Sequence, residues 1–202
     1  MLPKSVRLFL LAAVLASESA QGSPRVEPGA VRGPDRCEGG RIGSAEQAKA
    51  FATCRTVTGD LTIERTDLSD LSALSELRSV SGAFVVRDNA KLRSLDGLGR
   101  LEYAGSLTLH ANGLYGTSGL EGLRRLETLV ITGNQRLISL RGFRNLERVG
   151  TLVVSRNSRV CARMGLFPAL NRVEKRLTVS ANFGLSREEV ASLSARAKRG
   201  LP

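Results

Sequence analysis

Short apolar triplets recur along the chain at a nearly constant interval. In each triplet the first and third residues are apolar, so in a β-strand both side chains would point to the same face. The triplets begin 23, 23, 22, 23 and 25 residues apart and occupy residues 61–63, 84–86, 107–109, 129–131, 152–154 and 177–179. A motif repeated at such a period is typical of a solenoid, in which each coil stacks on the one before it. We therefore predict a mostly β solenoid of about six coils with a parallel sheet along one side.

A polar position follows each triplet three residues later. It is occupied by asparagine in all coils but the first, where Thr66 takes its place. In stacked coils these side chains would lie directly above one another. An amide both donates and accepts hydrogen bonds, so it can pair with backbone groups that the bend leaves free. We predict an internal asparagine ladder rather than a solvent-facing binding row, formed by Asn89, Asn112, Asn134, Asn157 and Asn182.

Two further positions repeat with the coils. Glycine stands two residues before four of the triplets, at Gly59, Gly82, Gly105 and Gly150, where we expect it to permit the tight corner that starts the strand. Leucines follow the asparagine at three-residue steps, which would return a side chain to the core at each bend; examples are Leu92, Leu95, Leu98 and Leu101.

Both ends of a stack need covers, and two capping-box sequences provide candidates. "SAEQ" at Ser44 predicts a helix through about Thr53, and "SREE" at Ser186 predicts a helix through about Lys198. The solenoid would then span residues 37–202, with an N-terminal cap over 37–54, coils over 55–185 and a C-terminal helix over 186–199.

The first 22 residues have the pattern of a signal peptide. Lys4 and Arg7 precede the apolar run "LFLLAAVLA", which is too short to span a bilayer. Cleavage after Ala16 or after Gly22 fits equally well. Residues 23–36 are rich in proline, glycine and charge, which favours a disordered linker. We expect an exported protein that is periplasmic, on the cell surface or secreted; whether it stays attached to the cell, and the organism, are left open.

Composition narrows the choice of partner only slightly. The net charge is +11, yet tryptophan is absent and aromatic residues make up only 4% of the chain. Arginines are spread over every repeat and are not interleaved with aromatic residues, which disfavours a specific nucleic-acid partner. The charge is compatible with an acidic partner such as an envelope polysaccharide, lipopolysaccharide or extracellular nucleic acid, although arginines at the solvated positions of a repeat explain it more simply.

The start of the first coil carries the most specific motif. Cys37-Glu-Gly-Gly is followed, after sixteen residues between the cysteines, by "CRTVTGDLTI" from Cys54. This segment resembles the receptor L domain, the ligand-binding solenoid of the insulin and epidermal growth factor receptors, and the related modules of fungal cell-wall and secreted bacterial proteins. A leucine-rich-repeat protein is the alternative. In that family the leucine usually follows the asparagine by two residues, whereas here it follows by three in most coils.

The resemblance implies a right-handed β-helix-like fold and a non-catalytic role in binding. In an oxidising compartment we expect Cys37 to pair with Cys54. Cys161 matches the place of a cysteine in the family's last coil, but no partner follows it. We expect it to be a buried, inert thiol, with pairing between chains as the alternative.

Candidate catalytic chemistry is sparse, and we expect no enzyme, metal or cofactor. His110 is the only histidine, and it falls one residue past a strand in a column that we expect to be variable and exposed. A glycan-cleaving β-helix enzyme is the alternative, and it would need clustered carboxylates for calcium. The acidic column of Glu102, Glu127 and Glu147 lies near Arg100 and Arg125, so mutual charge compensation explains it.

The outer face of the sheet is the candidate binding face. It should carry the middle residues of the strands and the residues one step past them, namely Thr62, Glu64, Val85, Arg87, Thr108, His110, Val130, Thr132, Val153 and Ser155. β-Branched residues also simply suit strands, so a structural reading is equally open. The predicted function is an adhesion, binding or envelope structural module that recognises an extracellular protein or glycan. The bends around Arg124, Arg144 and Arg148 are the second candidate for the site.

Overall fold

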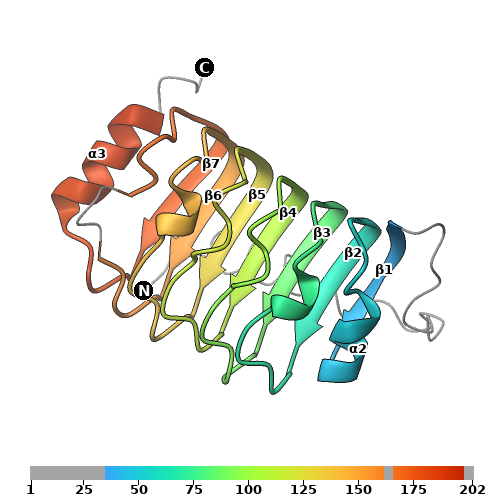
Figure 1. The fold of residues 1–202 in the computed structure, drawn as a ribbon. Helices are drawn as coiled ribbons and strands as arrows, with labels where there is room; N and C mark the ends of the chain where they lie inside the picture. Colours follow the sequence, from blue (N-terminus) through green and yellow to red (C-terminus); the bar gives the residue numbers. More distant parts are fainter. Residues whose placement is uncertain (1–34, 162–165, 198–202) are drawn as a thin grey trace, which may run out of the picture.

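A computed structural model of the chain describes residues 35–161 and 166–197. These residues form a parallel β-solenoid with one seven-stranded sheet, in which the strands lie side by side in chain order. Figure 1 shows the sheet as one wall of the stack, with helix α2 beside β1 and helix α3 beyond β7. The strands are β1 (Arg36–Ile42), β2 (Thr56–Glu64), β3 (Ser79–Arg87), β4 (Tyr103–His110), β5 (Arg125–Thr132), β6 (Arg148–Ser155) and β7 (Arg172–Ser180). The predicted signal peptide lies outside the described residues.

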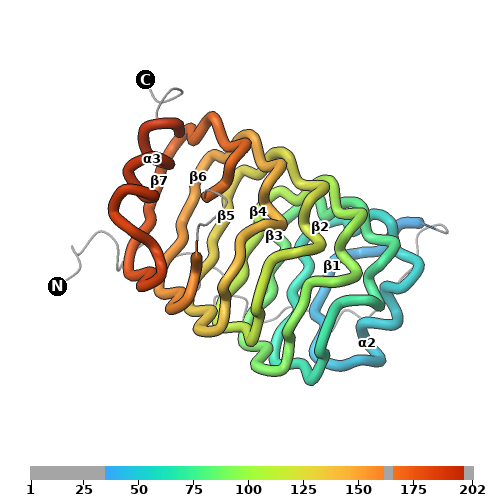
Figure 2. The backbone as a smooth tube through the Cα atoms, turned by 60° about the vertical axis from the view of Figure 1, so that its left-hand side comes forward, coloured from blue at the N-terminus to red at the C-terminus, as the bar shows by residue number. Residues whose placement is uncertain are grey.

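The predicted triplets pair residue for residue across the sheet. Leu61 pairs with Phe84, and the same register continues through Leu107, Leu129 and Leu152 to the last coil. The first and third residues of the triplets are fully buried in β2 to β6, as are most of the leucines at three-residue steps. Figure 2 shows the coils stacked in this order. The prediction of about six coils of roughly 23 residues is therefore confirmed.

The asparagine ladder is confirmed as a continuous internal chain of hydrogen bonds. Each side-chain oxygen accepts from the backbone N–H of the residue at the ladder position one coil earlier, as in the bond from Asn112 N–H to Asn134 at 2.9 Å. Each side-chain nitrogen donates to the carbonyl of the third triplet residue one coil earlier, as from Asn134 to Leu109 at 2.9 Å. Thr66 begins the chain through a hydroxyl bond to Asn89. The ladder asparagines are buried except for Asn182 in the last coil, which is partly exposed.

The residue before each ladder position adopts a left-handed backbone conformation. Its φ lies between 51° and 69° at Arg65, Asp88, Ala111, Gly133, Arg156 and Ala181. Only one of these residues is glycine, so the sequence did not point to this turn. The conformation costs roughly 1 kcal/mol or more for an ordinary residue. The ladder hydrogen bond formed by the next residue holds the turn in place.

Only one of the four glycines before the triplets serves the purpose that we predicted. Among Gly59, Gly82, Gly105 and Gly150, only Gly59 has a positive φ. At Gly105 a Cβ would lie 2.9 Å from the carbonyl oxygen of Gly82 in the coil below. At Gly82 and Gly150 it would likewise meet the neighbouring coil. Gly82, Gly105 and Gly150 are therefore required because neighbouring coils approach closely, whereas Gly59 is required by its φ of 85°.

The N-terminal cap contains a strand that the sequence did not predict. β1 pairs in parallel with β2 and places Arg36, which we assigned to the linker, opposite Thr56. Its glycines disfavour a strand, but a side chain at Gly39 would strike the backbone of Asp60, so the close approach of the two coils selects glycine.

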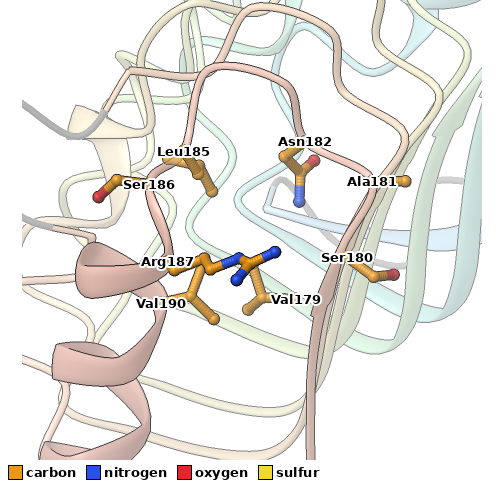
Figure 3. Close-up of a pocket in the computed structure, with 8 residues that line it drawn as sticks. All are labelled: Val179, Ser180, Ala181, Asn182, Leu185, Ser186, Arg187 and Val190. Carbon is orange, nitrogen blue, oxygen red and sulfur yellow. The ribbon is translucent and has the colours of Figure 1, made fainter.

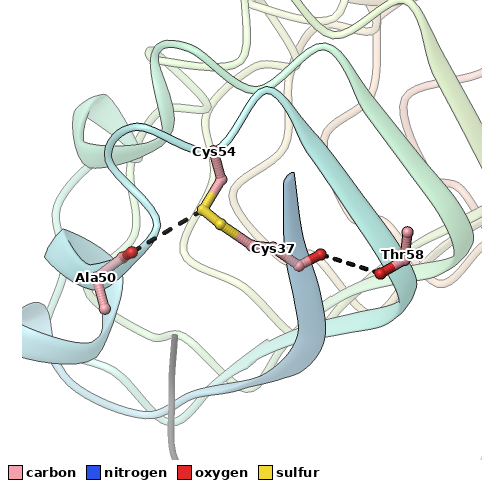
Figure 4. The surroundings of a disulfide bond; sticks show 4 residues. All are labelled: Cys37, Ala50, Cys54 and Thr58. Carbon is pink, nitrogen blue, oxygen red and sulfur yellow. Dashed lines mark hydrogen bonds between the residues drawn. A yellow bond between two sulfur atoms is a disulfide. The ribbon is translucent and has the colours of Figure 1, made fainter. Parts of the chain in front are cut away.

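Helix α2 (Ala45–Ala50) ends three residues earlier than predicted. The chain turns after Ala50 because Phe51 and Cys54 must both enter the core, where they are buried. Cys54 then forms the predicted disulfide with Cys37 on β1 (Figure 4). The N-terminal capping bond is present: Gln47 N–H donates to the Ser44 hydroxyl at 3.2 Å.

Helix α3 (Arg187–Ala197) covers the other end of the stack. Its predicted capping box is complete, because Glu189 N–H donates to the Ser186 hydroxyl at 3.1 Å and Ser186 N–H donates to the Glu189 carboxylate at 2.7 Å. Leu193, a residue of this helix, is fully buried. Leu177 and Val179 of the last coil are only partly buried, since no further coil stacks on them.

Candidate functional site

The outer face of the sheet brings the ten predicted site residues into two adjacent rows. The first row is formed by the middle residues of the triplets and the second by the last residue of each strand. Both rows run in register across β2 to β6. The first row contains Thr62, Val85, Thr108, Val130 and Val153; the second contains Glu64, Arg87, His110, Thr132 and Ser155.

The first row forms a half-exposed strip, which we call the β-branched strip, and Thr178 of β7 extends it. All of its side chains point outward, yet all are only partly exposed. Parallel strands lie about 4.8 Å apart, so neighbouring β-branched side chains cover one another's flanks. The strip is therefore flat, with three valines among threonines and their methyl groups facing solvent.

The second row is less exposed than predicted. We expected a variable exposed column, but Glu64, Thr132 and Ser155 are buried, and Arg87 and His110 are partly buried. Contacts along the row account for this difference. The carboxylate of Glu64 lies between two guanidinium groups, 2.7 Å from Arg41 and 2.6 Å from Arg87.

His110 is held by a contact within the same row. Its Nδ1 lies 2.8 Å from the hydroxyl of Thr132 on the next strand. Ser155 follows in register, and its buried hydroxyl has no hydrogen-bond partner among the described residues. The histidine is therefore part of the polar edge of the strip, where a hydroxyl fixes the orientation of its ring.

The predicted charge compensation holds for Glu102 and Glu147, but between coils rather than within one bend, and Glu127 forms no ion pair among the described residues. Arg100 binds Glu76 at 2.6 Å, and Arg124 binds Glu147 at 2.9 Å. Glu102, which we placed near Arg100, instead lies 3.7 Å from Arg78. The prediction missed these partners because residues in register on adjacent coils lie closer together than residues along one bend. Each exposed pair contributes little to stability.

Cys161 is exposed, so the expectation of a buried thiol was wrong. Its backbone N–H donates to the carbonyl of Ile138, and Ile138 in turn donates to Tyr115. Tyr115 and Ile138 are also exposed, so this row faces solvent. The row lies in the bends between the strands, which we call the loop wall. The neighbouring Val160 is fully buried and takes the core position that we had given to the cysteine.

A hollow of about 270 Å³ lies at the C-terminal end of the stack, between the last coil and α3 (Figure 3). Asn182 and Arg187 line it together with Val179 and Val190. The amide of Asn182 already donates to Val154 and accepts from Asn157. The amide of this last ladder residue is therefore already hydrogen-bonded within the fold.

Metal-ligating side chains do not cluster in the ranges 35–161 and 166–197, where no three of His, Cys, Asp or Glu gather. Within the same ranges no helix has the length and apolar character needed to cross a bilayer.

Comparison with known families agrees with the geometry. The model of the receptor L domain family matches residues 53–169, more than half of the chain. The match begins beside Cys54, includes the strands β2 to β6 and ends in the bend that precedes β7. No curated protein matches the chain in sequence.

Proposed function

Because the chain belongs to the receptor L domain family of ligand-binding solenoids, we propose that it is a non-catalytic extracellular binding module. The partner docks on the β-branched strip. The observation that carries this proposal is the in-register row of half-exposed valines and threonines across β2 to β7.

The strip has the features of a preorganised protein-binding surface. Its β-branched side chains are stiff at χ1 and are held on a continuous hydrogen-bonded sheet, so little conformational entropy is lost when a partner docks. The apolar centre is edged by the ion-paired Glu64 and by the His110–Thr132 contact. An apolar centre with a polar rim is the arrangement found in protein interfaces. Val130 and Val153 offer methyl groups rather than hydrogen bonds, which favours a protein over a glycan at this position.

The non-catalytic and extracellular parts of the proposal have separate support. The carboxylates of Glu76 and Glu147 are engaged by arginines, and the His110 ring contacts a threonine hydroxyl. A disulfide between Cys37 and Cys54 fits an oxidising compartment.

The test is a triple substitution of Val85, Val130 and Val153 by lysine. A partner is first captured from the extracellular or envelope fraction with the parent protein and identified, and its affinity is then measured with purified components. We expect the triple variant to lose binding, because three lysines place charge at the centre of the interface. Unchanged affinity of the folded variant would show that the strip is not the site.

A matched control carries three lysines on the loop wall, at the exposed positions Ser75, Ala90 and Ser118. It adds the same charge away from the strip. We expect it to bind as the parent does; an equal loss in both variants would indicate a general charge effect and contradict the proposed site.

A further inference from the structure

The strands β4 to β7 begin with a tyrosine and three arginines. Tyr103 opens β4, and Arg125, Arg148 and Arg172 open the next three strands. Arg125 pairs in register with Arg148, and Arg148 pairs in register with Arg172. All four side chains are exposed. We call this set the strand-start row; it lies at the opposite end of the strands from His110 and Ser155.

Register places the three arginines side by side on adjacent strands. Adjacent parallel strands are about 4.8 Å apart, so the backbone positions of these arginines repeat at roughly that interval across the sheet. Among the described residues, Arg125 and Arg148 have no ion-pair partner, whereas Arg172 lies 3.4 Å from Glu174. The unpaired like charges of Arg125 and Arg148 repel one another at this spacing, and the net charge of +11 adds to that potential. An anionic ligand laid along the row would relieve the repulsion.

The surface over the row is hollowed rather than flat. A hollow of about 370 Å³ extends over the starts of β4 to β6 and the adjoining part of β7. Its lining includes Tyr103, Arg125 and Arg148, together with Glu127 and Lys175. Glu174 lines it as well, so one aromatic ring, several cations and two carboxylates face the same space.

We propose that the strand-start row binds an acidic polysaccharide of the uronic-acid class. Regularly spaced carboxylates along the sugar chain pair with the arginine forks. The Tyr103 ring provides an apolar face for a sugar ring, with a polar tip at its edge. Glu127 and Glu174 accept hydrogen bonds from sugar hydroxyls. The ligand lies across the strands, along the line of the arginines.

Other polyanions fit this set of side chains less well. A single-stranded nucleic acid requires successive aromatic platforms, and the row has a single ring at one end. Phosphates, or the carboxylates of an acidic peptide, would also be repelled by Glu127 and Glu174 without any hydroxyl to bind them. The mixture of acceptors and donors favours a ligand that carries both hydroxyls and carboxylates.

This inference extends the proposed binding role to a second surface, and either surface can fail without the other. The lysine substitutions at Val85, Val130 and Val153 leave the strand-start row intact. We expect the affinity of that triple variant for the polysaccharide to remain within about twofold of the parent's. Such a result would show that the two sites are separate.

The experiment measures binding of the purified chain to alginate oligosaccharides by calorimetry at about 0.05 M and 0.15 M salt. Replacing Arg125, Arg148 and Arg172 by glutamine should weaken binding about tenfold at the lower salt, which corresponds to about 1.4 kcal/mol. The control variant replaces three exposed arginines beyond the strand ends, Arg65, Arg141 and Arg159, by glutamine. It carries the same net charge and should bind within about twofold of the parent.

Tyr103→Ala separates a sugar ligand from a general polyanion. It should weaken alginate binding and leave weak binding of poly-glutamate and of an oligothymidine unchanged. Neutral dextran should not bind. The proposal is overturned if alginate does not bind, if the two arginine triples lose equal affinity, or if poly-glutamate or oligothymidine binds more tightly than alginate.

Discussion

The side-chain oxygen of Asn134 accepts a hydrogen bond from the backbone N–H of Asn112, 22 residues earlier, at 2.9 Å. Its amide nitrogen donates to the carbonyl of Leu109 in the same earlier coil. Asn134 is fully buried, so its loss leaves these backbone groups unpaired in the interior. We predict that Asn134→Ala lowers the free energy of unfolding by about 1–3 kcal/mol, measured by urea denaturation.

Asn182→Ala is the matched control for the ladder. Asn182 makes the same two types of bond, to Asn157 and Val154, but it lies at the partly exposed end of the stack. Water can replace its bonds there, so we expect a loss below about 1 kcal/mol. Equal losses at both positions, or no loss at Asn134, would contradict the view that burial makes the ladder stabilising.

The left-handed turn before each ladder residue predicts that two substitutions at equivalent positions change stability differently. Gly133 has φ of 69°, and an added Cβ would meet no atom closer than 3.6 Å, so Gly133→Ala adds backbone strain without a clash. We expect it to cost about 1 kcal/mol. Ala111 has φ of 51° at the equivalent position, and Ala111→Gly should be neutral or slightly stabilising. Thermal melts of both variants test this; a destabilised Ala111→Gly would show that the conformation is not a source of strain.

The disulfide should contribute strongly to stability. It joins residues 17 apart and fixes β1 to the start of the first full coil. By restricting the unfolded chain it is expected to contribute about 3 kcal/mol. Replacing Cys37 and Cys54 together by serine should therefore lower the melting temperature, while Cys161→Ser should leave it unchanged. A melting temperature that does not respond to the double substitution would refute this.

Cys161 should be reactive in the native state. It is exposed in a row of the loop wall that also exposes Tyr115 and Ile138. A thiol-alkylating reagent should modify it without denaturant, and mapping of non-reduced peptides should show it separate from Cys37 and Cys54. Mild oxidation should yield dimers on a non-reducing gel that disappear in Cys161→Ser. Protection of Cys161 from the reagent would mean that this position is covered.

Asp70 predicts a small dependence of stability on pH. Hydrogen bonds from the side chain and backbone of Ser72, with a smaller one from Ser69, lower the pKa of Asp70 below its usual value. A lowered pKa in the folded state stabilises the protein above the unfolded value of about 3.9, and this stability is lost as the pH falls through the folded value. Asp70 is only partly buried, so Asp70→Asn should cost less than about 1 kcal/mol at neutral pH.

The same substitution should have no effect near pH 2, where the carboxyl is protonated in both states. Urea denaturation at the two pH values gives this comparison. A difference between parent and variant that persists unchanged in acid would show that the hydrogen bonds do not depend on the charge.

The repeat alone predicted the coils, the buried triplets and the ladder. A coil cannot bury its own apolar edge, so a fixed spacing of Leu107, Leu129 and Leu152 implies stacking in register before any coordinates are known. The position of Asn134 relative to Ile131 follows from the same period. The capping box at Ser186 is also local, and the structure forms it as predicted. These features depend on residues that are close in sequence or on a motif that repeats at a fixed period.

Contacts between coils decided the rest. β1 forms because Arg36 meets Thr56 on the next strand, although its own glycines disfavour a strand. Glu64 is buried because Arg41 and Arg87 lie on either side of it on neighbouring strands. The strand-start row exists because Arg125, Arg148 and Arg172 share a register while lying more than twenty residues apart in sequence. Local pattern carries no information about such partners, since their distance is set by the stacking of coils rather than by the chain between them.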